Sequence, residues 1–125
     1  MHARLRSRLA GFNPQELANT VWAYATARHA APELFDAMAE AALPKVPDFE
    51  PQNIGNTAWA YATLQLKDED LLRAISTASV EKIEEFNPQD LANTAWAYAK
   101  HNLKDEDLLK AISKADAAAS VAASP

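Results

Sequence analysis

The sequence predicts an all-α fold, a right-handed α-solenoid of three 37-residue helix-turn-helix repeats. The first observation is a self-match: FNPQELANTVWAYA, which starts at Phe12, recurs from Phe86 with 12 of its 14 positions unchanged. The second is a constant step, because Pro14, Pro51 and Pro88 lie 37 residues apart. The third is composition, since only two of the 125 residues are glycine, which disfavours a turn-rich β fold.

The first helix of each repeat has a clear start. Asn13 and Asn87 take the N-cap position, a proline follows at the first helical position, and an acidic residue comes three residues after the cap. Glu50 replaces the asparagine in the second repeat, so we expect a weaker cap there. These helices are predicted to end near the following residues: Arg28, Gln65 and Asn102.

The second helix of a repeat begins at an aspartate. Asp68 and Asp105 are each followed by Glu-Asp, and acidic residues in a first turn complement the helix dipole. We interpret these acidic clusters as helix caps and not as a cation site, because their spacing forms no convergent loop. Pro44 and Pro47 should end the first of these helices early. The predicted spans are 32–43, 69–84 and 106–119.

The repeats give the domain organisation. A basic leader with three arginines and no acidic residue comes first, and it reads either as a first helical turn or as part of a targeting peptide. No polar capping unit is evident at either end, so end-to-end contacts between solenoids are possible. The predicted segments are the leader 1–11, the repeats 12–48, 49–85 and 86–119, and an Ala-rich tail 120–125.

Several function classes find no support in the sequence. No apolar run is long enough to span a bilayer, and no cysteine is present. The three histidines do not share a repeat position, and no nucleophile, phosphate-binding or paired-carboxylate motif occurs. We therefore expect no catalytic residues, no metal and no cofactor. The net charge of −5 makes the chain a poor generic partner for nucleic acid.

The first helices carry two different faces at 100° per residue. Leu17, Val21 and Tyr24 fall on an apolar arc that we expect to be buried. Polar residues form a stripe on the other side, and a tryptophan stands where the two meet. The stripe residues are Gln15, Asn19 and Thr26, then Gln52, Asn56 and Thr63, then Gln89, Asn93 and Lys100.

Two interpretations of the stripe remain open. Amides can read base edges, and they can equally form a ladder of hydrogen bonds between adjacent helices. For Trp22, Trp59 and Trp96, and for the repeated tyrosines, a core position is the more common role, so we expect the three tryptophans to be mostly buried. Gly55 replaces an alanine of the other repeats, which suggests a close helix approach between the first two repeats, or mere tolerance.

The strings NPQELANTVWAYA, NIGNTAWAYA and NPQDLANTAWAYA resemble the first helix of octotricopeptide-type and heptatricopeptide-type repeats. This resemblance covers about 12–114. It implies a helix-pair solenoid of a plastid or mitochondrion that acts in RNA stability, processing or translation, with single-stranded RNA as its partner. The residues that would bind RNA or another partner are Gln15, Asn19, Arg28, Gln52, Asn56, Gln89, Asn93 and Lys100.

Lys100 is the one cation on the stripe and would contact a phosphate, with Arg28 as a second candidate. The alternative function is a protein–protein scaffold or an assembly subunit of a larger organellar complex. The acidic charge, the short array and the apolar ends of the solenoid favour this alternative. Both interpretations describe a non-enzymatic binding module.

Overall fold

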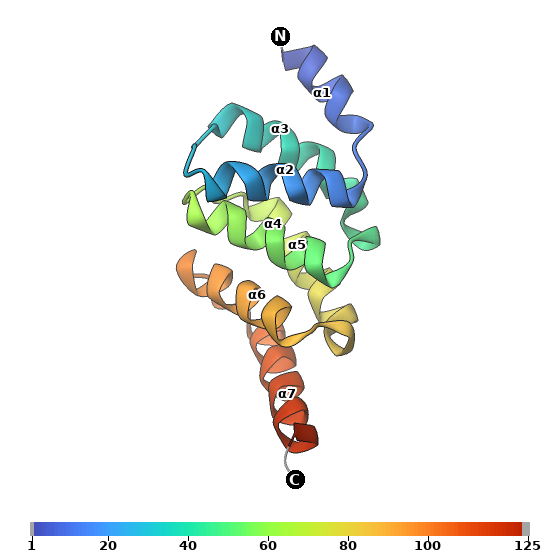
Figure 1. The fold of residues 1–125 in the computed structure, drawn as a ribbon, viewed down its shortest axis with the longest axis vertical. Coiled ribbons are helices and arrows are strands. Elements are labelled where there is room, and N and C mark those ends of the chain that lie inside the picture. The colour runs from blue at the N-terminus through green and yellow to red at the C-terminus, as the bar shows by residue number, and fades with distance from the viewer. Residues whose placement is uncertain (1, 124–125) are drawn as a thin grey trace.

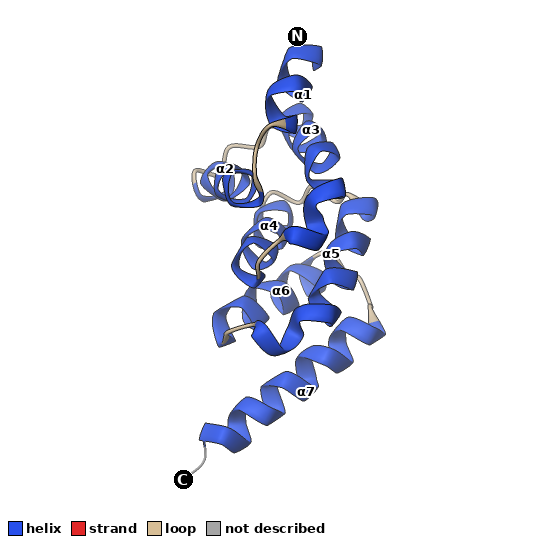
Figure 2. Ribbon diagram, turned by 90° about the vertical axis from the view of Figure 1, so that its right-hand side faces the viewer, coloured by secondary structure: helices blue, strands red, loops and turns tan. Residues whose placement is uncertain are grey.

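The computed structural model describes residues 2–123, and every regular element in this range is helical (Figure 2). The all-α prediction is therefore confirmed, while the right-handed sense of the solenoid stays a prediction. The α-helices are α1 (His2–Ala10), α2 (Pro14–Thr26), α3 (Pro32–Ala42), α4 (Pro51–Thr63), α5 (Glu69–Lys82), α6 (Pro88–Lys100) and α7 (Glu106–Ala123). Two 3-10 helices, η1 (Leu43–Asp48) and η2 (Ile83–Glu85), follow α3 and α5.

The helices form two layers. In one layer α2, α4 and α6 lie side by side in chain order, and in the other α1 packs on α3, α3 on α5, and α5 on α7 (Figure 1). The buried apolar residues of both layers form one core cluster between them. The opposite side of α2, α4 and α6 is left as a continuous outer surface.

Helix α1 is a correction to the predicted six helices in three pairs. Leu9 is buried and Leu5 is partly buried against the core, and α1 contacts α3. Arg4, Arg6 and Arg8 are exposed, and the Arg6 guanidinium lies 3.1 Å from a Glu40 carboxylate oxygen. The leader thus forms a polar cap on this end of the second layer, contrary to the expectation that no such cap exists.

The predicted helix starts are confirmed. The Asn13 side chain accepts a hydrogen bond from the Glu16 N–H at 2.7 Å, and the Glu16 carboxylate accepts one from the Asn13 N–H at 2.9 Å. Asn87 and Asp90 repeat this reciprocal arrangement at the start of α6. In α4 the side chain of Asn53 reaches back to the N–H of Glu50, at 2.9 Å.

The first-layer helices end two residues earlier than predicted, and α7 runs four residues further. The residues expected to end α2, α4 and α6 instead adopt the left-handed conformation, with φ values of 54°, 58° and 58° at Arg28, Gln65 and Asn102. In each case the N–H of the following residue donates a hydrogen bond to the carbonyl of the tyrosine five residues before it, as in a Schellman cap. Glycine would adopt this conformation at lower cost, yet all three positions hold polar side chains.

Two buried tyrosines join successive repeats. The Tyr61 hydroxyl donates to the Phe35 carbonyl at 2.5 Å, and the Tyr98 hydroxyl donates to the Leu72 carbonyl, 37 residues further along in both partners. Both rings are 2% exposed, which confirms the core assignment at these positions. Burial raises the pKa of both hydroxyls above the usual tyrosine value, with smaller contributions from nearby carboxylates. Tyr24 is only half-buried.

The prediction that the three tryptophans are mostly buried is wrong for Trp22 and Trp96. Trp22 and Trp96 are each 44% exposed, and Trp59 is half-buried. The spacing explains the error, because each tryptophan follows the stripe asparagine by three residues and the stripe glutamine by seven, which places all three on one helical face. Trp22 and Trp96 therefore belong to the polar stripe, whereas Trp59 lies at the boundary and packs against the core.

A lysine closes each of the first two repeats. Lys45 in η1 and Lys82 at the end of α5 lie 37 residues apart, and each ammonium donates to the carbonyl of the phenylalanine that begins its repeat and to the carbonyl two residues before it. The acceptors are Ala10 at 2.7 Å and Phe12 at 2.5 Å for Lys45, and Pro47 at 2.8 Å and Phe49 at 2.6 Å for Lys82. We call this arrangement the lysine clasp.

Gly55 lies at a different contact from the one expected. A Cβ built there would meet the Asp90 carbonyl oxygen at 3.5 Å and the Asn93 Cβ at 3.6 Å, both on α6. The approach is therefore between the second and third repeats and not between the first two. These are ordinary van der Waals distances, so the glycine is not required by lack of space.

Candidate functional site

The outer surface of α2, α4 and α6 brings the predicted stripe residues together. The glutamines at 15, 52 and 89 are exposed, Asn19 is exposed, and Asn56 and Asn93 are half-buried. A groove of about 450 Å³ runs between α2 and α4, and Gln15, Asn19, Gln52 and Asn56 line it. Within residues 2–123 no hydrogen bond joins the amide side chains of Asn19, Asn56 and Asn93 across the helices.

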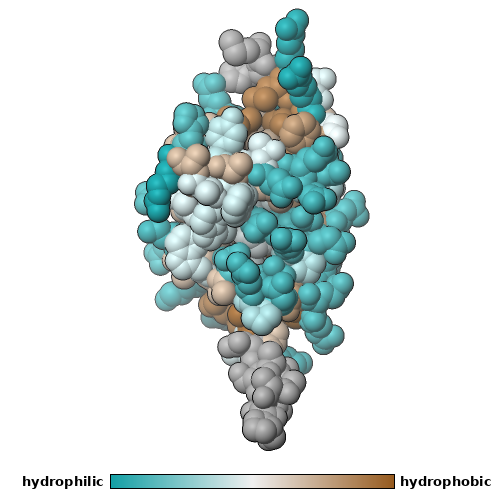
Figure 3. Space-filling model, in the orientation of Figure 1, coloured by the Kyte–Doolittle hydropathy of each residue, from teal (hydrophilic) through white to brown (hydrophobic). Residues whose placement is uncertain are grey.

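The tryptophans complete this surface. Along α2 the residues Gln15, Asn19, Trp22 and Thr26 follow the spacing i, i+4, i+7 and i+11, which defines one face of a helix. The same spacing recurs on α4 and α6. Figure 3 shows a hydrophilic area over the amino-terminal halves of these helices, beside a paler area over their carboxyl-terminal halves. Amides and large aromatic rings therefore lie next to each other in each repeat.

Charge is unequal at the two edges of this surface. Asp48 and Glu50 line the groove at the amino-terminal edge. At the carboxyl-terminal edge the exposed cations are Arg28, Lys67, Lys100 and Lys104. Arg28 and Lys100 were predicted as site residues, and the structure places Arg28 in the loop after α2 and Lys100 at the last position of α6.

Lys67 and Lys104, also at this edge, were not predicted as site residues. Both come one residue before an aspartate cap, and they are 37 residues apart, which is the signal that identifies them as a repeated feature. His101 lies near Lys67 and is 8% exposed, and its Nε2 has no hydrogen-bond partner in the described part of the chain. Burial and the Lys67 charge lower the pKa of His101.

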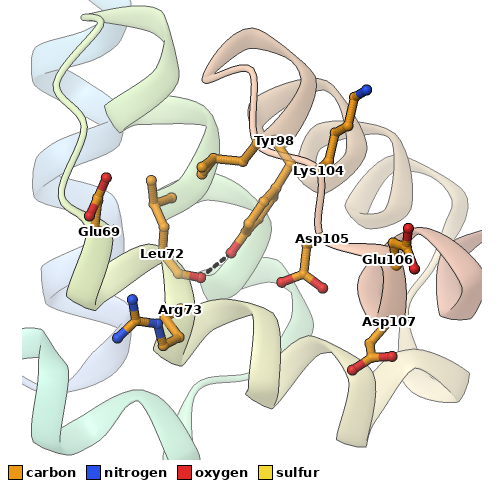
Figure 4. A pocket seen from close by; sticks show the side chains of 9 residues that line it. Glu69, Leu72, Arg73, Tyr98, Lys104, Asp105, Glu106 and Asp107 are labelled. Atoms are coloured by element: carbon orange, nitrogen blue, oxygen red, sulfur yellow. Dashed lines mark hydrogen bonds between the residues drawn. The ribbon is translucent and has the colours of Figure 1, made fainter.

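Another cavity lies between α5 and the loop that leads into α7. Its volume is about 550 Å³, and Glu69, Asp105, Glu106 and Asp107 line it beside the Tyr98–Leu72 hydrogen bond (Figure 4). Lys104 points away from these carboxylates. Asp105 caps α7 by accepting the Leu108 N–H at 3.0 Å, and Asp68 caps α5 in the same way, which confirms their predicted role as helix caps.

The described residues contain no group of three or more histidine, aspartate or glutamate side chains placed to hold a metal ion. Over the same range no helix is both long enough and apolar enough to cross a membrane.

Comparison with known proteins gives one match. The family model described as RNA-editing substrate-binding complex 6 protein matches residues 2–122. No curated protein matches the chain. The match does not extend to octotricopeptide-type repeats, so that resemblance stays a prediction. Because the matched range covers nearly all of the chain, the protein belongs to the RNA-editing substrate-binding complex 6 family.

Proposed function

We propose that the protein is a non-enzymatic subunit that binds single-stranded RNA along the outer surface of α2, α4 and α6. The observation that carries this proposal is the exposure of Trp22 and Trp96, each 44% accessible, in line with the exposed glutamines. Single-stranded RNA is recognised by stacking of bases on aromatic rings and by hydrogen bonds to base edges. Each repeat presents both kinds of group on one helical face.

The charge at the two edges suggests how the RNA lies. Phosphates would follow the carboxyl-terminal edge, where Arg28, Lys67 and Lys100 are exposed, and they would avoid Asp48 and Glu50 at the other edge. Bases would then point inward to the tryptophans and amides. Helical-repeat proteins often contact one base per repeat, so this array would contact about three nucleotides. Such a short site would act together with other RNA-binding subunits.

The family supports this role, since its name describes a complex that binds RNA-editing substrates. RNA stability, processing or translation is the finer function that the repeat resemblance implies. We include a mitochondrial location in the proposal, because RNA-editing complexes of this type are mitochondrial. The plastid gains no support from the family match.

A scaffold role is the second candidate, and the acidic cavity between α5 and α7 favours it. Four carboxylates line this cavity together with two cations, Arg73 and Lys104, so acids outnumber cations there, which would disfavour phosphates and suit a basic protein segment. The two functions use different surfaces, so variants of one surface should leave the other intact.

The proposed function is tested by titrating fluorescently labelled single-stranded RNA at two salt concentrations. Trp96→Ala should weaken binding by about 1–3 kcal/mol, the range for one stacked base. Lys100→Ala should weaken binding for all sequences and reduce the salt dependence by about 0.7 for one lost phosphate contact. Asn56→Ala should instead change the preference among bases, because amides read base edges.

Lys110→Ala on α7 is the matched control, since Lys110 is an exposed cation that is not on the proposed surface. It should leave both affinity and salt dependence unchanged. If the parent protein binds no RNA at low salt, where electrostatic attraction is strongest, RNA binding is refuted and the scaffold function takes its place.

A further inference from the structure

The three repeats present the same pair of amide side chains on the outer surface of α2, α4 and α6. The six amides are Gln15, Gln52 and Gln89 at one repeat position, and Asn19, Asn56 and Asn93 at another. Buried positions beside them vary, since Ile54 takes the place of Leu17 and Gly55 that of Ala18. The amides of the outer surface are therefore more uniform than the packing residues of the same helices.

None of these six amides has a hydrogen-bond partner in the part of the chain that the structure describes. The asparagines that cap helices differ in this respect, because Asn13 and Asn87 each accept a backbone N–H at 2.7 Å. Asn56 and Asn93 are half-buried, and polar groups withdrawn from water are usually bonded within the protein. The donors and acceptors of these amides are thus available to a ligand.

The amides lie where neighbouring helices meet. Two of the glutamines and two of the asparagines line the groove of about 450 Å³ between α2 and α4. Between α4 and α6 the Asn93 Cβ is 3.6 Å from the Cβ position of Gly55, so the third asparagine also lies against the preceding helix. A ligand that crosses the three helices therefore meets the same amides in each repeat.

The length of a helix suits one nucleotide lying along it. Lys100 follows Asn93 by seven residues, which is about 10 Å of helix rise, and Trp96 stands between them. A phosphate at Lys100 would place its base on the Trp96 ring, with the edge of the base toward the Asn93 amide. Stacking on an aromatic ring tolerates every base, so the amides are the groups that can select one.

The chemistry of the amides favours adenine. An asparagine or glutamine amide offers a donor and an acceptor side by side, and adenine N6 and N7 form the complementary pair. Asp48 lines the groove at the amino-terminal edge, and Glu85 takes the same position one repeat later. Carboxylates accept hydrogen bonds from an exocyclic amino group, which adenine has and uracil lacks.

We propose that the outer surface of α2, α4 and α6 binds a run of consecutive adenines, with one adenine for each repeat. Helical-repeat proteins that read one base per repeat do so with two or three side chains of each repeat. Here those side chains are the same in all three repeats, so they select the same base three times. This inference rests on the proposed function and adds the base composition of the RNA.

Single-stranded RNAs of equal length and charge provide the test. A uridine RNA with three consecutive adenines at its centre is compared with one in which uridines separate the same three adenines. The consecutive run should bind more tightly. Replacing one adenine of the run by uridine should weaken binding about tenfold, within the range for one lost amide–adenine pair. Runs of cytosine and of guanine complete the comparison.

Asn56→Asp tests the base-reading role of the amide directly. A carboxylate cannot donate to adenine N7, but it accepts a hydrogen bond from cytosine N4. The variant should therefore prefer cytosine at the middle of the run and keep adenine at both ends. Asn19→Asp and Asn93→Asp should instead change the preference at opposite ends. Asn102→Asp is the matched control, because it makes the same chemical change at an exposed loop residue and should leave base preference unchanged.

Circular dichroism shows whether each variant remains helical, and the exposed Asn19 carries the test if the change at half-buried Asn56 prevents folding. The proposal is overturned if the parent protein binds consecutive and separated adenines equally, or if it prefers a run of another base. It is also overturned if the folded aspartate variants keep the parent's preference for adenine. In each of these cases RNA is still bound, so the proposed function stands, whereas the absence of binding to every RNA overturns both.

Discussion

His101 is the residue whose protonation should affect stability most near neutral pH. Its pKa is lowered in the folded protein, so the unfolded chain takes up the proton first as the pH falls. The folded state therefore loses stability below about pH 6.5, the ordinary histidine value. Leu64 occupies the same position in the second repeat, which shows that a leucine suits this site.

We predict that His101→Leu removes this acid-induced loss and raises stability by about 1 kcal/mol, because the unpartnered Nε2 is no longer buried. Urea unfolding at pH 8 and pH 5 should show a smaller difference in the variant than in the parent. His29→Leu is the control, since His29 is exposed. An unchanged difference between the two pH values would mean that another group carries the acid sensitivity.

The sequence suggested that Gly55 permits a close helix approach, but the structure leaves room for a side chain there. A Cβ there would meet α6 only at ordinary contact distances of 3.5 and 3.6 Å. We predict that Gly55→Ala stabilises the protein by about 0.5–1 kcal/mol, because alanine loses less backbone entropy in a helix. Thermal unfolding measures the change. A lower melting temperature would show that α6 has to move away from α4 to admit the methyl group.

Residues that act within one helical turn were predictable, and those that depend on a neighbouring helix were not. Asn13, Asp68 and Asp105 were identified as caps because a cap and its N–H partner are close in sequence. Trp22 was misplaced because hydrophobicity alone assigned it to the core. Its spacing from Asn19 already placed it on the outer face, so the signal was present but was outweighed.

The lysine clasp joins the last part of a repeat to the backbone at its beginning. Lys82 donates to the carbonyls of Pro47 and Phe49 at 2.8 and 2.6 Å, and hydrogen bonds from a charged donor are stronger than neutral ones. We predict that Lys82→Ala destabilises the protein by about 1–3 kcal/mol. Urea unfolding at a single pH checks this, with Lys110→Ala as a control of equal charge change. Equal effects of both substitutions would show that net charge matters and the clasp does not.

Helix α1 shows what a repeat pattern cannot predict about an element. A nine-residue helix is not stable alone, so its formation depends on the surface that α3 offers to Leu5 and Leu9. Those two leucines are four residues apart, which is compatible with a helix but too short a pattern to establish one. The three arginines of this segment also suggested a targeting peptide. In the structure their exposed side chains form the outer side of the cap.

For the whole molecule, the 37-residue step predicted the stack, and the stack determines which side chains share a surface. The row of amides followed directly from this step, and its role in RNA binding remains a proposal. The gathering of exposed cations at one edge did not follow, because it requires the carboxyl-terminal ends of α2, α4 and α6 to lie along the same side of the stack (Figure 1). Lys67 and Lys104 lie in or next to such loops, outside every helical pattern.

The lysine clasp also sets an order in which the molecule should open. The residue that follows Lys82 by the repeat step is Ala119, which has no ammonium group, so the third repeat lacks the contact that closes the first two. In a linear array each unit is held mainly by its neighbours, and the least fastened end unravels first. Native-state hydrogen exchange should therefore show a gradient, with the amides of α7 exchanging through small openings and those of α4 only through global unfolding. The third repeat would therefore open before the other two and become accessible to proteases and chaperones while they remain folded.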